Sequence, residues 1–141
     1  MSLSGDAHFQ AQAPALQLAL APTQQAPSLA RAAIARLTDT RLIDTPTLAT
    51  LTLLVSELVT NAVIHPDVEP PGDIRLVARH CRGVLRVEVT DCGSGFTPRP
   101  RDPGAAHRGY GLFLLDKEAT RWGVDRLGGT TVWFELALPS A

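Results

Sequence analysis

Asp91 is the residue whose type and surroundings most clearly suggest chemistry. It ends an apolar run that starts at Val84, and Gly93 and Gly95 follow it closely. A carboxylate at a strand end can accept a hydrogen bond from the exocyclic amine of a purine, and glycines beside it let the backbone approach a flat ring. Aspartate and glycine also dominate surface turns, so this segment alone is at least as typical of an exposed loop.

A second glycine pair lies ahead of a hydrophobic stretch. Gly109 and Gly111 follow Arg108, and the pattern predicts a helix over residues 110–119. The free N–H groups at the start of such a helix can bind phosphate, and an arginine beside them can contribute positive charge. A plain connection between a loop and a helix, with a solvated arginine, is an equally ordinary interpretation of these residues.

Glu57 and Asn61 stand four residues apart in a long helical pattern. We expect this helix to have Thr45 as its N-cap and to run to about Ile64, ahead of Pro66. The acid and the amide would then share one side of the helix. An asparagine oxygen can bind Mg²⁺ and a carboxylate can accept a proton, although a structural hydrogen bond at the edge of the core would need the same residues.

The rest of the chain supplies elements that could hold these groups. Period-two and helical patterns predict a strand over residues 16–20, a helix over residues 27–37 and a strand hairpin over residues 74–90. A loop over residues 97–108 and a closing hairpin over residues 121–138 follow. Helices separate from antiparallel strands predict an α+β two-layer sandwich, with helices on one face of a mixed, mainly antiparallel sheet. We expect a flexible tail over residues 1–14 and one domain over residues 15–141.

Composition narrows the class of protein. The 141 residues suit a single core, and 13 basic against 14 acidic residues give no reason to expect nucleic-acid binding. Two cysteines are too few for a disulfide scaffold. No apolar run approaches the ~20 residues that span a bilayer, and a basic N-terminal signal is missing. We therefore expect a cytoplasmic protein without membrane contact.

Taken in order, these motifs resemble those of the GHKL (Bergerat-fold) ATPases, whose domain is also called the histidine kinase-like ATPase domain. Residues 57–65 resemble the N-box, residues 91–96 the first glycine box, and residues 108–112 with 121–123 the second box and the strand after it. Within that superfamily the chain is most similar to the small bacterial anti-sigma factor serine/threonine kinases. The resemblance extends over residues 15–138.

The resemblance implies a role for each motif residue. Glu57 would be the general base, and Asn61 would hold Mg²⁺ at the bound ATP. Asp91 would bind the adenine amine, in a base pocket shaped by Gly93 and Gly95.

The second box and the last strand would complete the nucleotide site. Gly109 and Gly111 would let a lid cover the phosphates, with Arg108 as a cation there and Leu112 leading into the helix. Thr130 would support the adenine-binding aspartate.

The implied function is an ATP-binding anti-sigma regulatory factor with protein-serine kinase activity. Such a protein sequesters a sigma factor and phosphorylates a serine of an anti-anti-sigma antagonist. Two alternatives stay open: a non-catalytic nucleotide-binding module for partner switching, and an ATP hydrolase whose lid does mechanical work. Direct nucleic-acid contact is not expected, and the sequence leaves homodimer formation open.

Overall fold

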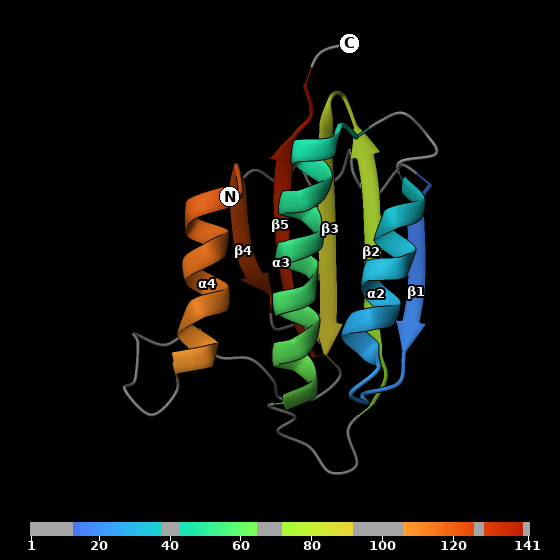
Figure 1. Cartoon of the computed structure of the whole chain (residues 1–141), viewed down its shortest axis with the longest axis vertical. Helices are drawn as coiled ribbons and strands as arrows, with labels where there is room; N and C mark the ends of the chain where they lie inside the picture. Colours follow the sequence, from blue (N-terminus) through green and yellow to red (C-terminus); the bar gives the residue numbers. More distant parts are fainter. Residues whose placement is uncertain (1–12, 38–42, 65–71, 92–105, 126–128, 140–141) are drawn as a thin grey trace.

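In the described part of the chain, a five-stranded antiparallel sheet carries three helices on one face (Figure 1). The computed structural model describes residues 13–37, 43–64, 72–91, 106–125 and 129–139. The strand order is β1-β2-β3-β5-β4, and each of these four pairings is antiparallel. The predicted α+β two-layer sandwich is therefore confirmed, and no parallel pair occurs between the described strands.

The elements follow the predicted order along the chain. The strands are β1 (Leu16–Leu20), β2 (Ile74–Cys81), β3 (Val84–Asp91), β4 (Arg121–Asp125) and β5 (Thr130–Ala137), and the helices are α2 (Ala26–Ala35), α3 (Thr45–Ile64) and α4 (Ala106–Glu118). Figure 1 shows α2 over β1 and β2, α3 in the middle of the layer, and α4 beside the β4 edge. The predicted tail falls largely on residues outside the described ranges.

The central helix, α3, begins one residue earlier than predicted, at Thr45. The backbone oxygen of Asp44 accepts the first helical bond, from Leu48, and its side chain accepts from the Thr47 N–H at 2.9 Å. Asp44 is therefore the N-cap, in place of Thr45, because its carboxylate reaches the third helical N–H. Hydrogen bonds from the Thr47 side chain and backbone also hold the pKa of Asp44 below its ordinary value of 3.8.

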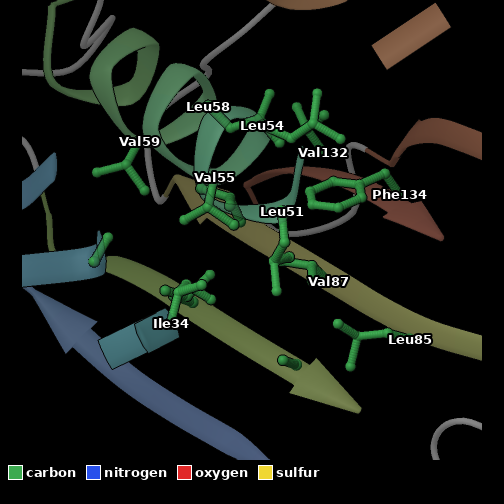
Figure 2. Packing of buried hydrophobic residues seen from close by; sticks show 14 of the residues in the cluster. Ile34, Leu51, Leu54, Val55, Leu58, Val59, Leu85, Val87, Val132 and Phe134 are labelled. Carbon is green, nitrogen blue, oxygen red and sulfur yellow. The ribbon is translucent and has the colours of Figure 1, made fainter. Parts of the chain in front are cut away.

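Burial explains why α3 is so apolar. The helix is 20 residues long and, by length and composition alone, could cross a bilayer. The sequence had been expected to contain no apolar run of that length. Seven of its residues are buried, at helical spacing. Figure 2 shows how Leu51, Val55 and Leu58 of this helix lie among side chains of β3 and β5, including Val87 and Phe134. A core-facing stripe of this kind accounts for the composition.

The last helix, α4, starts earlier than predicted. It begins at Ala106, whereas the glycine pattern had placed the start near Tyr110. Gly109 and Gly111 therefore lie within its first two turns and do not precede it. Alanine is the strongest helix former, so the residues ahead of the glycines can extend the helix even though each glycine costs about 1 kcal/mol.

The β2–β3 hairpin fixes the direction of the strand that carries Asp91. Its connection is Arg82-Gly83, and both residues have positive φ, 53° and 77°. That pair of values matches the two-residue turn that follows the natural twist of a hairpin. The register then runs without a slip from Cys81 opposite Val84 to Ile74 opposite Asp91, so Asp91 falls at the far end of the sheet.

No described helix covers the second face of the sheet, which is closed by its own side chains. Arg86 lies over the Trp133 ring, 4.1 Å from its centroid, and donates to Glu135 at 2.9 Å. Both charged side chains are buried, and a second arginine, Arg121, lies 3.6 Å from the same carboxylate. Paired charges on an aromatic ring thus shield this face from water.

Gly123 makes this cluster possible and supplies a test of it. It is the cross-strand partner of Trp133, and an added Cβ would lie 2.7 Å from the ring. We predict that Gly123→Ala lowers the free energy of unfolding by roughly 1–3 kcal/mol, the usual cost of overpacking. Urea denaturation measures it. In a Trp133→Leu background the loss should disappear, and an equal loss in both backgrounds would contradict the packing argument.

Candidate functional site

One cavity brings together residues from three distant parts of the chain. Its polar lining residues are Asn61, Asp91 and Thr130. The remaining lining is apolar: Leu58, Ala62, Val89 and Val132. A mostly apolar cavity with a few convergent polar groups is the usual form of a small-molecule site.

Asn61 enters the cavity from the sheet-facing side of α3. Its neighbours Leu58 and Ala62 are buried, and the asparagine itself is only 4% exposed. Its Nδ2 atom is buried and has no hydrogen-bond partner among the described residues. Leaving a buried amide unpaired costs about 1–3 kcal/mol, so an amide retained here is better explained by a ligand than by the core.

Asp91 and Thr130 enter from the floor of the cavity. They are opposite each other in the β3–β5 ladder, Asp91 being the last residue of β3 and Thr130 the first of β5. Both are buried, at 6% and 2% exposure. This arrangement places a carboxylate and a hydroxyl at the end of the sheet, where a flat ring could lie against Val89 and Val132.

Glu57 lies one helical turn before Asn61 but does not line the cavity. Its side chain is half-buried. Within the described ranges, no hydrogen bond or ion pair involves it. A ligand held by the lining residues alone would therefore not need Glu57.

The other predicted site residues are distributed as follows. Gly93 and Gly95 lie outside the described residues. Gly109 and Gly111, with Arg108, belong to the first turns of α4. Leu112 on the same helix is half-buried and packs against the core, away from the cavity lining.

Four apolar lining residues were not predicted as part of the site. Val89 and Val132 lie two residues from Asp91 and Thr130 on the same faces of their strands, and Leu58 and Ala62 flank Asn61 on α3. Period-two and helical spacing around each polar residue would have identified them. The same four positions also serve packing, since all of them belong to the hydrophobic core.

The residues present fit a magnesium-bound nucleotide better than a metal held by protein alone. Across the described part of the chain, no group of three metal-binding side chains occurs. Mg²⁺ in nucleotide sites commonly takes one or two protein oxygens and completes its shell with phosphates and water. A single buried carboxamide, that of Asn61, suits this mode.

The family assignment agrees with this geometry. A fold of helices on one face of an antiparallel sheet, with a small apolar cavity between helix and sheet, defines an α+β ligand-binding domain. The family model for the histidine kinase-like ATPase domain matches residues 19–136. The chain belongs to this family, and ATP is the ligand that the family implies.

Solved structures with the same fold include proteins of two bacteria. The RsbU and RsbW domains of Rv1364c from Mycobacterium tuberculosis match with TM-score 0.69 and 22% identity, over 87% of this chain and 32% of that one. The blue-light activated histidine kinase of Erythrobacter litoralis matches with TM-score 0.55 and 29% identity, over 68% of this chain and 32% of that one.

The histidine kinase domain of the same Erythrobacter litoralis protein matches with TM-score 0.50 and 31% identity, over 64% of this chain and 44% of that one. The chain thus spans a third to less than half of the structures it resembles. A comparison with curated proteins found no match.

The burial of Asn61 leads to a stability prediction. Asn61→Leu should raise the free energy of unfolding of the protein without nucleotide, by about 1 kcal/mol, because it removes an unpaired buried amide. Chemical denaturation measures the change. The matched control is Leu58→Asn, one turn earlier, which should lower stability by at least about 2 kcal/mol. A destabilised Asn61→Leu variant would mean that the amide serves the core.

Proposed function

We propose that this domain binds ATP with Mg²⁺ in the cavity between α3 and the ends of β3 and β5. The observation that carries the proposal is the convergence of Asn61, Asp91 and Thr130 on one apolar cavity. Asn61 and Asp91 are 30 positions apart along the chain, and Asp91 and Thr130 are 39 positions apart. The family match supplies the class of ligand.

Each described residue has a distinct task in this proposal. The Asp91 carboxylate accepts a hydrogen bond from the adenine amine, and Thr130 lies beside it on the neighbouring strand. Val89 and Val132 form the apolar floor for the base. The Asn61 oxygen would hold Mg²⁺, and the bound nucleotide with its metal would supply the transferable phosphoryl group and neutralise its charge.

We further propose that the domain is a cytoplasmic anti-sigma regulator with protein-serine kinase activity. It would sequester a sigma factor and transfer phosphate to a serine of an antagonist protein. The motif resemblance to anti-sigma factor kinases over residues 57–65, 91–96 and 108–112 supports this function. Glu57, one helical turn before Asn61 on α3, would accept the proton of the attacking serine hydroxyl.

A second function is favoured by one observation. Glu57, the proposed general base, does not line the cavity that Asn61 and Asp91 share. The residues that would bind the nucleotide therefore do not include it. A non-catalytic module that binds ATP to hold a partner-binding surface would need nothing more.

Nucleotide binding itself is tested by calorimetry. We expect ATP to bind more tightly than GTP, whose O6 would face the Asp91 carboxylate, and to bind more weakly in EDTA. Asp91→Asn should weaken ATP binding roughly tenfold, the size of one charge-assisted hydrogen bond. Asp125→Asn, at an exposed acid of β4, is the matched control and should bind normally. Equal affinity for ATP and GTP would contradict the placement of the base.

Glu57→Gln separates the two candidate functions. If Glu57 is the general base, phosphoryl transfer from labelled ATP to water or to candidate antagonist proteins should fall roughly 10²–10⁴-fold, with ATP affinity unchanged. Glu118→Gln, which alters an exposed acid at the end of α4, controls for the loss of one negative charge. Unchanged transfer in Glu57→Gln would reject Glu57 as the general base, and no transfer by the unmodified protein would favour the binding module.

A further inference from the structure

A pair of threonine hydroxyls joins β3 to β5 directly behind the cavity. The Oγ1 atoms of Thr90 and Thr131 are 2.8 Å apart. The two residues are opposite each other in the register, and both are half-buried. Because side chains alternate along a strand, these hydroxyls lie on the sheet face opposite the one that carries the helices and the cavity.

The position of this pair in the ladder is what gives it a role. The next rung is Asp91 opposite Thr130, and it is the last rung of the ladder within the described residues, where β3 ends at Asp91 and β5 begins at Thr130. A strand end lacks further rungs to hold it, so it is the part of the ladder that opens most readily. The hydrogen bond between the two threonine hydroxyls therefore joins the strands one residue before Asp91, whose carboxylate lines the cavity.

A second link on the same face shows how the two strands are otherwise joined. Arg86 and Glu135 bond at 2.9 Å, four rungs further from the cavity. That buried ion pair holds the middle of the ladder, whereas the threonine pair holds its end. A carboxylate displaced by about 1 Å loses much of its hydrogen-bond geometry, so the end of the ladder matters most for recognition.

We propose that Thr90 and Thr131 are positioning residues for base recognition by Asp91. They do not touch the nucleotide; they hold the ends of β3 and β5 together so that the Asp91 carboxylate keeps its place in the cavity. This inference rests on the proposed binding of ATP at Asp91, and it adds two residues that lie outside the cavity and outside the recognised motifs.

Valine substitutions test the pair, since valine keeps the branched shape and favours strands. Thr90→Val and Thr131→Val should each weaken ATP binding about two- to tenfold, the range for one hydrogen bond. The double variant should bind no more weakly than either single one, because all three lose the same bond. Thr90→Ser and Thr131→Ser, which keep a hydroxyl, should bind nearly normally.

Selectivity distinguishes positioning from general support of the sheet. The affinity for GTP should change little, so the ratio of ATP to GTP affinity should fall. All affinities are to be measured well below each variant's melting temperature. Thr50→Val on α3, at a half-buried threonine that does not line the cavity, is the matched control and should leave both affinities unchanged. If one valine variant does not fold, the other decides, because it breaks the same bond.

Three outcomes would overturn the inference. Normal ATP affinity in both valine variants, with weakened binding in Asp91→Asn, would reject the positioning role and leave the proposed function standing. Equal losses of ATP and GTP affinity would show a merely structural role. Absence of ATP binding by the unmodified protein would reject the proposed function and this inference together.

Discussion

The antiparallel pairing of β3 with β5 is the interaction on which the rest of the structure depends. It sets Asp91 opposite Thr130 at the end of the sheet, although 38 residues lie between them in the sequence. The same ladder forms the floor on which α3 packs, so it also determines which residue of that helix faces the strand ends. A slip of one residue would turn the carboxylate to the opposite face of the sheet and would remove it from the cavity.

The two faces of the sheet are shielded from water by different kinds of side chain. On the helix side, Leu, Val and Phe side chains pack against α2, α3 and α4. On the other side, Trp133 lies under Arg86 beside Gly123, and Glu135 pairs with the arginine. The charges there are buried with partners, which avoids the large cost of a lone buried charge. Asn61 in the cavity differs, since its amide nitrogen has no partner within the described ranges; an unpaired buried amide of this kind is typical of a functional site.

Much of the fold was predictable because its signals are local. The alternation of apolar residues around Cys81-Arg82-Gly83 predicted the β2–β3 hairpin, and the helical spacing from Leu48 to Ala62 predicted α3. The errors also have local causes. The cap fell on Asp44 because a carboxylate competes well with a hydroxyl for the same N–H groups. The start of α4 moved to Ala106 because alanine propensity extends a helix through a glycine-containing turn.

By itself, the sequence determined the types of the elements, the order of the motifs and the chemical groups available to a ligand, since these depend on residues close together in the chain. Tertiary structure decided which of those groups meet. Asn61, Asp91 and Thr130 share a cavity, while Leu112 packs into the core and Glu57 does not line the cavity. It also brought the Thr90 and Thr131 hydroxyls together behind Asp91. The physical reason is that strand order and register arise from long-range burial, which no short segment of sequence specifies.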